Sequence, residues 1–207
     1  MKKLNFIIKC GLALLLLSFY SCESWLNVTP SDRLSEEMLF NDREGFVKAL
    51  NGVYIELNTN ELYGRNLTAG ALDVMGQYYS VASSSHAFYN YGGLVYTGND
   101  EKALFDNMWQ KCYAVIACCN TIIEKCDENK AGLSPVWRGS IKGEALALRA
   151  MLHFDMLRLF GPLTSELDKE SIPYQTNSDQ TVTPLLSGSE VVGLILDDLK
   201  NAVGLLK

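Results

Sequence analysis

The sequence contains few of the residues and motifs that most catalytic sites need. It has 2 histidines among 207 residues, so a metal centre built on several imidazoles is not expected. No nucleophile elbow, phosphate-binding loop or zinc-protease helix occurs in it. Acid pairs such as Asp197 and Asp198 are adjacent, so their side chains diverge instead of forming an acid–base pair. We therefore expect a protein that is not an enzyme and uses neither a cofactor nor a metal.

Basic residues are also fewer than acidic residues. The chain has 18 Lys and Arg against 24 Asp and Glu. Residues 1–21 include Lys2, Lys3 and Lys9 and no acid, so the remainder has 15 basic and 24 acidic residues, a net charge of −9. No basic stripe is available to displace counterions from phosphates, and a nucleic-acid partner is disfavoured.

The sequence lacks a hydrophobic run long enough to span a membrane comfortably. Residues 4–20 are short for a bilayer core of about 30 Å, and Lys9 interrupts them. Two lysines, an apolar run at 12–17 and Ser21-Cys22 are instead typical of a lipoprotein signal peptide. We expect cleavage before Cys22, acylation of Cys22 (palmitate among its chains) and one domain over residues 22–207. The alternatives are ordinary secretion or a Cys22 that only packs in a core.

Hydrophobic spacing and end signals predict four main helices. Asn41 with Glu44 has the form of a capping box before a helix at about 42–58. A second helix runs from about Asn99 to Asp127, with an apolar stripe that includes Cys112, Cys119 and Cys126. A third lies between Ser134-Pro135 and Gly161-Pro162, and a fourth follows the capping box of Ser187 and Glu190. The fold class is therefore all-α.

The third helix is apolar on almost every side between Ala145 and Phe160, which indicates burial between layers of helices. If Phe154 is packed in this way, its replacement by alanine should cost about 3 to 5 kcal/mol. His153 follows Arg149 by one turn, which disfavours its protonated form and is typical of a packed histidine.

Four cysteines, Cys112, Cys118, Cys119 and Cys126, fall in the second predicted helix. A seven-residue spacing corresponds to about 10.5 Å along a helix, too far for a disulfide or a shared zinc ion. We interpret them as small buried hydrophobes, with a bridge to another element as the alternative.

Residues 74–99 are rich in tyrosine, serine, glycine and asparagine, and they predict a long irregular loop. Aromatic faces can stack on sugar rings while neighbouring hydroxyl and amide groups bind the sugar's hydroxyls. The candidate ligand-binding residues are Tyr78, Tyr79, Tyr89, Tyr91 and Tyr96. The alternative is that these rings only pack over helix ends. Residues 164–186 are expected to be an extended connector without visible chemistry.

Five ordered segments resemble the SusD/RagB lipoproteins of Bacteroidetes outer membranes. These are Cys22 to Pro30, Ala49 to Tyr54, the set Trp109, Tyr113, Ile116 and Asn120, the run Glu144 to Pro162, and Asp198 to Leu206. The resemblance implies stacked helical hairpins of the tetratricopeptide type. Ala150, Phe154 and Pro162 stand at the spacing of positions 20, 24 and 32 of that repeat.

The resemblance also implies a function. It suggests a non-enzymatic, surface-exposed lipoprotein of the outer membrane that binds oligosaccharide or peptide and delivers it to a SusC-like TonB-dependent transporter. Members of the family are typically more than twice as long, so we expect this chain to correspond to their N-terminal part. The alternatives are a truncated helical-repeat adaptor that binds a protein without a glycan and, more remotely, an exported glycosidase.

Overall fold

A computed structural model of the chain describes residues 36–179 and 181–207. The expected signal peptide and Cys22 lie outside these ranges. Within residues 37–207, which form one compact unit, the long helices are α3 (Arg43–Leu57), α6 (Asn99–Glu128), α7 (Pro135–Phe160) and α8 (Gly188–Leu205). Short helices are α2 (Glu36–Leu39), α4 (Ala71–Met75) and α5 (Tyr89–Gly92). Among the described helices, none combines the length and apolar character needed to cross a membrane.

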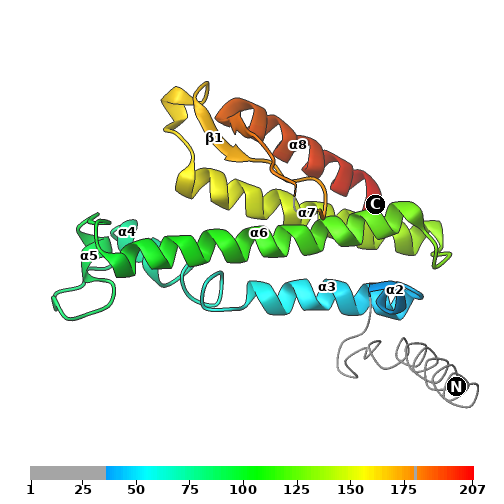
Figure 1. The fold of residues 1–207 in the computed structure, drawn as a ribbon, viewed down its shortest axis with the longest axis horizontal. Helices are drawn as coiled ribbons and strands as arrows, with labels where there is room; N and C mark the ends of the chain where they lie inside the picture. Colours follow the sequence, from blue (N-terminus) through cyan, green and yellow to red (C-terminus); the bar gives the residue numbers. More distant parts are fainter. Residues whose placement is uncertain (1–35, 180) are drawn as a thin grey trace, which may run out of the picture. The chain divides into compact units, whose positions relative to one another are not determined.

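The long helices pack in the order α3, α6, α7 and α8, and neighbours run in alternate directions (Figure 1). Helix α6 lies in the middle, with α3 on one side and α7 on the other, and α8 covers α7. The predicted apolar stripe of α6 is confirmed, since Met108, Cys112, Cys119 and Cys126 are all 0% exposed. Burial of the Cys119 thiol raises its pKa to about 12, and the three buried cysteines act as hydrophobes. Cys118 is exposed, so the interpretation is wrong for this residue, which lies off the apolar stripe.

Helix ends largely follow the predicted signals. Ser134 Oγ accepts a hydrogen bond from the Trp137 N–H, and Ser187 with Glu190 forms a complete capping box. The predicted cap at Asn41 is wrong. Asp42 caps α3 instead, and its Oδ1 accepts from the Gly45 N–H at 2.9 Å. The helix begins at Arg43, which places Asn41 one residue too early to reach that N–H.

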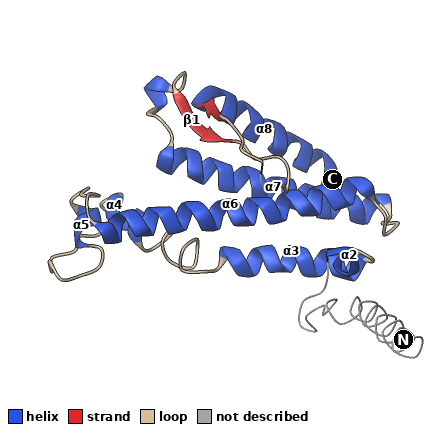
Figure 2. Cartoon of the chain, in the orientation of Figure 1, coloured by secondary structure: helices blue, strands red, loops and turns tan. Residues whose placement is uncertain are grey.

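The predicted connector at 164–186 contains regular structure. A 3₁₀ turn, η2 (Thr164–Glu166), precedes strand β1 (Glu170–Pro173), which pairs antiparallel with β2 (Leu185–Ser187) next to α8 (Figure 2). Both strands are only three or four residues long and stand beside prolines, so their sequence shows little of the alternation that predicts a strand.

The prediction that the second half of α7 is buried on nearly every side is wrong for one face. Leu152, His153 and Met156 are 0% exposed, but Met151 is 38% and Phe154 is 47% exposed. Helices α6 and α8 pack on α7, and Met151 and Phe154 lie along a groove between α7 and α8 that the described residues leave open. The expected cost of 3 to 5 kcal/mol for Phe154→Ala is therefore too large.

Candidate functional site

The tyrosine-rich segment joins α4 through α5 to α6, and four of its five candidate rings are exposed. Tyr78 is 83% exposed, and Tyr79, Tyr89 and Tyr96 are 43%, 42% and 38% exposed. Tyr91 is 2% exposed, and its ring packs edge-on against Phe105 with 6.0 Å between centroids. Tyr91 thus has no free face for stacking, and we leave it out of the proposed binding surface.

Hydrogen bonds within the segment hold this loop in one arrangement. The Gln77 side chain donates to the Gly92 carbonyl at 2.8 Å and so ties α4 to the end of α5. Tyr79 donates its hydroxyl proton to the Ala69 and Gly70 carbonyls. His86 is exposed, and its Nδ1 accepts from the Phe88 N–H at 3.1 Å. The segment is irregular between its two short helices, as predicted, and the side chains of Gln77 and Tyr79 attach it to the end of α5 and to the residues before α4.

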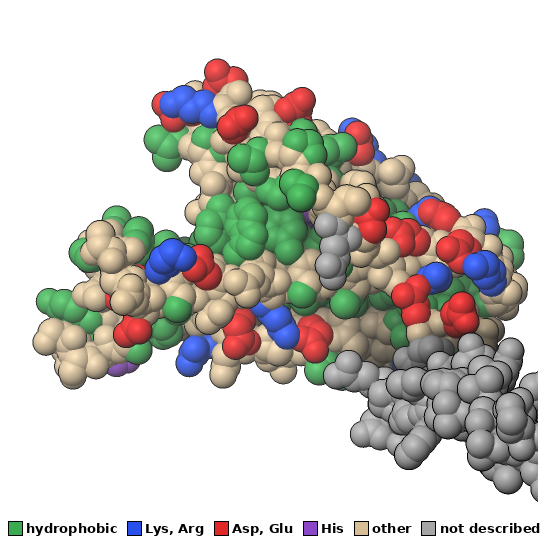
Figure 3. All heavy atoms as spheres, viewed as in Figure 1, with side chains coloured by type: hydrophobic (Ala, Val, Ile, Leu, Met, Phe, Trp, Pro, Cys, Tyr) green, Lys and Arg blue, Asp and Glu red, His purple; other side chains and the backbone are tan. Residues whose placement is uncertain are grey.

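A groove of about 390 Å³ opens where this loop meets the start of α6 and the end of α7. Its walls combine aromatic rings with polar side chains: Met75, Tyr96, Thr97, Gly98, Asn99, Lys102, Phe105, Asp106, Leu159 and Phe160. Figure 3 shows hydrophobic side chains gathered in a hollow over the first half of α6, between α5 and β1. Among the candidate tyrosines, only Tyr96 lines the groove.

The rings of the groove are fixed by edge-to-face packing. Phe105 lies nearly perpendicular to both Tyr96 and Phe160, with centroid distances of 5.3 and 6.3 Å. Lys102 and Asp106 form an ion pair at the wall, and both are largely exposed. Sequence reasoning missed Phe105 and Phe160 because each lies on a long helix, where an aromatic residue is usually interpreted as core. The groove can offer apolar faces to a ring and polar groups to hydroxyls.

A second groove, of about 360 Å³, lies between α7 and α8 and differs in chemistry. It is lined by Ala150, Met151, Phe154, Val192, Ile195, Leu196 and Leu199, all apolar. No side chain in it can bond a hydroxyl, so it is a poor site for a sugar and a better match for apolar side chains of a polypeptide.

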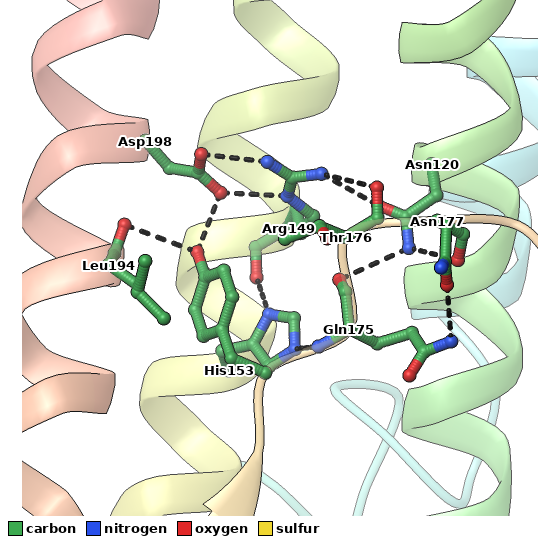
Figure 4. A network of polar contacts seen from close by, with 9 residues as sticks. Asn120, Arg149, His153, Gln175, Thr176, Asn177, Leu194 and Asp198 are labelled. Atoms are coloured by element: carbon green, nitrogen blue, oxygen red, sulfur yellow. Dashed lines mark hydrogen bonds and ion pairs between the residues drawn. The ribbon is translucent and has the colours of Figure 1, made fainter. Parts of the chain in front are cut away.

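A buried polar network joins α6, α7 and α8 to the segment that follows β1 (Figure 4). Arg149 forms a two-pronged pair with Asp198, with both N···O distances 2.7 Å, and donates to Asn120 Oδ1 at 2.8 Å. The Tyr174 hydroxyl donates to Asp198 Oδ2 at 2.6 Å. Arg149 and Asp198 are 6% and 7% exposed, so this pair is satisfied within the protein.

His153 has a defined protonation state in this network. Its Nε2 accepts from the Gln175 N–H at 3.0 Å, so its Nδ1 carries the proton and donates to the Arg149 carbonyl at 2.9 Å. Burial, with a further contribution from the Arg149 charge, lowers the pKa of His153 to about 4. The ring stacks on Tyr174 with centroids 3.9 Å apart. The prediction of a packed, neutral histidine is confirmed.

A continuous series of aromatic contacts links the groove to this network. Phe160 meets Trp109 at 5.0 Å, Trp109 meets Tyr113 at 4.7 Å, and Tyr113 meets His153 at 5.9 Å between centroids. The walls of the groove therefore rest on packed core side chains of α6 and α7, which favours a preformed site.

Comparison with known proteins identifies the family of this chain. A SusD-like family model, described as "Starch-binding associating with outer membrane", matches residues 24–207. The chain belongs to this SusD-like family. The family resemblance inferred from the five sequence segments is thereby confirmed.

Curated relatives and solved structures agree with this assignment. SusD-like protein P38 of Formosa agariphila is 27% identical over 199 residues, covering 88% of this chain and 34% of the relative. SusD-like protein P2 of the same organism is 25% identical over 166 residues, covering 78% and 30%. This SusD-like chain thus spans about a third of the length of the curated relatives it matches.

Two solved structures share the fold. A SusD superfamily protein from Bacteroides thetaiotaomicron has a TM-score of 0.62 at 20% identity, over 80% of this chain and 38% of that one. A putative sugar binding protein from Bacteroides vulgatus has a TM-score of 0.64 at 24% identity, over 81% and 38%. The predicted fold class, all-α with stacked helical hairpins, is confirmed, and the described residues are mostly helical with one short strand pair.

Proposed function

We propose that the groove beside the tyrosine-rich loop binds a sugar ring of a nutrient oligosaccharide. The observation that carries this proposal is the combination of fixed rings and polar groups in one groove: Tyr96, Phe105 and Phe160 beside Asn99, Lys102 and Asp106. A pyranose has an apolar face and a rim of hydroxyls, which such walls complement. Tyr78, Tyr79 and Tyr89, exposed on the same loop, extend the proposed surface.

The wider role that we propose is capture of nutrient at the cell surface, without catalysis. The chain would be anchored in the outer membrane through acylated Cys22 and would deliver its ligand to a SusC-like TonB-dependent transporter. Membership of a family described as starch-binding and associated with the outer membrane supports this role. A chase with labelled fatty acid tests the anchor: label should enter the wild-type chain and not Cys22→Ser.

The binding proposal is tested by affinity electrophoresis of the chain through gels that contain amylopectin, xylan, laminarin or a peptide digest. We expect retardation by at least one polysaccharide, and about a tenfold loss of affinity for Tyr96→Ala. Tyr54→Ala is the matched control, since Tyr54 is similarly exposed (43%) but lies on α3. Retention of none of the polysaccharides, or equal retention of both variants, would contradict the proposal; retention by the peptide gel alone would identify a peptide carrier.

A second candidate function is a helical-repeat adaptor that binds a protein partner and no glycan. The wholly apolar groove between α7 and α8 favours it, because such walls suit an apolar helix face of another polypeptide. Co-purification of the chain with a transporter barrel, lost on Leu196→Glu and accompanied by no polysaccharide retention, would select this function over the first.

A further inference from the structure

Glu101, in the first turn of the long helix α6, has a buried side chain. It is 5% exposed, whereas its neighbours Asp100 and Lys102 are exposed. Its Oε1 accepts a hydrogen bond from Asn90 Nδ2 at 2.6 Å, which joins α6 to the short helix α5. This hydrogen bond, followed by one from the Glu101 backbone, lowers the pKa of the carboxyl group and keeps it ionised.

The same carboxylate rests against the backbone of Gly98. A Cβ atom at position 98 would lie 2.0 Å from Glu101 Oε2 and 3.1 Å from its Cδ, so a larger residue there would displace the carboxylate. Gly98 belongs to the stretch Tyr96–Asn99, all four residues of which line the groove. Glu101 therefore lies between α5 on one side and a wall of the groove on the other.

The α5 side of this contact carries rings of the same cluster. Tyr91 follows Asn90 in α5, and its ring packs on both Phe105 and Tyr96. A shift of Asn90 would move Tyr91 and, through it, the ring of Tyr96 that faces the groove. The position of Tyr96 thus depends on both ends of the Asn90–Glu101 contact.

We propose that Glu101 is a positioning residue for the groove, whose carboxylate, bonded to Asn90 and seated on Gly98, holds Tyr96–Asn99 in a ligand-ready arrangement. This inference rests on the proposed function, because it assigns a role within the same groove. Ordering a loop when a ligand binds costs conformational entropy. Because the contact orders this wall beforehand, it increases affinity without touching the ligand. The contact lies in the first turn of α6, where local opening does not require the core to unfold.

The substitutions that test this proposal change the charge of a side chain while keeping its size. Asn90→Asp places two carboxylates at hydrogen-bond distance, and their repulsion should separate α5 from α6. The double variant Asn90→Asp with Glu101→Gln restores a donor and an acceptor at the same two positions. Asn107→Asp, an exposed site on α6, is the matched control for an added negative charge.

The first readout needs no ligand. Amide hydrogen exchange of residues 88–98 should quicken by about tenfold or more in Asn90→Asp, return to the wild-type rate in the double variant and stay unchanged in Asn107→Asp. The thermal midpoint and exchange in α7 should change little in all three. The inference would be overturned if residues 88–98 of Asn90→Asp exchanged at the wild-type rate, or if their exchange in the double variant did not return to that rate.

The second readout is retention by the polysaccharide that binds the wild-type chain most strongly. Affinity should fall in Asn90→Asp and recover in the double variant, in parallel with exchange. A loss of affinity with unchanged exchange would overturn the positioning role and indicate direct contact with the ligand. If the wild-type chain binds no polysaccharide, the proposed function fails, and the exchange data alone decide whether Glu101 orders this wall.

Discussion

Lowering the pH from about 7.5 to 5 should destabilise the protein through His153. The folded state requires a neutral imidazole, because Nε2 accepts the Gln175 N–H and the ring stacks beside the Arg149–Asp198 pair. Burial lowers the folded-state pKa from 6.5 to about 4. Between these two values the unfolded chain binds a proton that the folded chain excludes, so stability falls as the pH decreases.

The magnitude follows from the difference in pKa. The stabilisation is fully present above pH 6.5, is about 2 kcal/mol smaller at pH 5, and has decreased by about 3 kcal/mol once the pH passes below 4, at about 1.4 kcal/mol for each unit. For a domain with a total stability of about 5 to 15 kcal/mol, this change is large.

Urea denaturation followed by circular dichroism at the two pH values measures the effect. His153→Gln should be less stable at pH 7.5 but should lose the part of the pH dependence that lies between 4 and 6.5. His86→Gln, in the exposed loop, should keep the wild-type pH dependence. If wild type and His153→Gln respond to pH with equal slopes, the argument about the imidazole is refuted.

Two further pairs of substitutions test the packing. Asp198→Asn should cost about 3 to 5 kcal/mol in urea denaturation, because it leaves Arg149 charged and buried without its partner, whereas Asp197→Asn at the exposed neighbour should cost less than about 1 kcal/mol. Equal effects would contradict a buried pair. Phe154→Ala should cost about 1 kcal/mol, since the ring is 47% exposed, and Leu152→Ala, at 0% exposed, about 2 to 5 kcal/mol. The reverse order would show that the exposed face of α7 is misassigned.

The helices could be predicted from the sequence because their signals are local. Ser134-Pro135 and the Ser187–Glu190 box act within one turn, and the apolar stripe of α6 repeats along a single helix. The exposed position of Phe154 could not be predicted in this way. An apolar surface on a helix indicates that something covers it, and the sequence does not state whether that cover is present in the same stretch of chain.

The segment after β1 shows a second limit on what can be predicted from the sequence. Several attachments of β1 and this segment use backbone atoms: the Tyr113 hydroxyl donates to the carbonyl of Pro173, the last residue of β1. Asn120 donates to the carbonyls of Gln175 and Asn177, and Glu124 accepts the Ser178 N–H. Because any residue type supplies these backbone groups, the composition of 164–186 gave no sign of the contacts. The groove was missed for a related reason, since Phe105 and Phe160 are brought together only by the packing of α6 against α7.

The ring contacts of Trp109 give the protein an internal optical probe. Its indole meets Phe160, a wall of the groove, edge-on at 5.0 Å, while Trp137 lies under the Arg43 guanidinium at the start of α7. An occupant of the groove that shifts Phe160 would change the emission of Trp109 and leave that of Trp137 unaltered. Fluorescence of a double variant, Trp25→Phe with Trp137→Phe, which leaves Trp109 as the one tryptophan of the sequence, can therefore follow ligand entry at micromolar protein concentration without any attached dye.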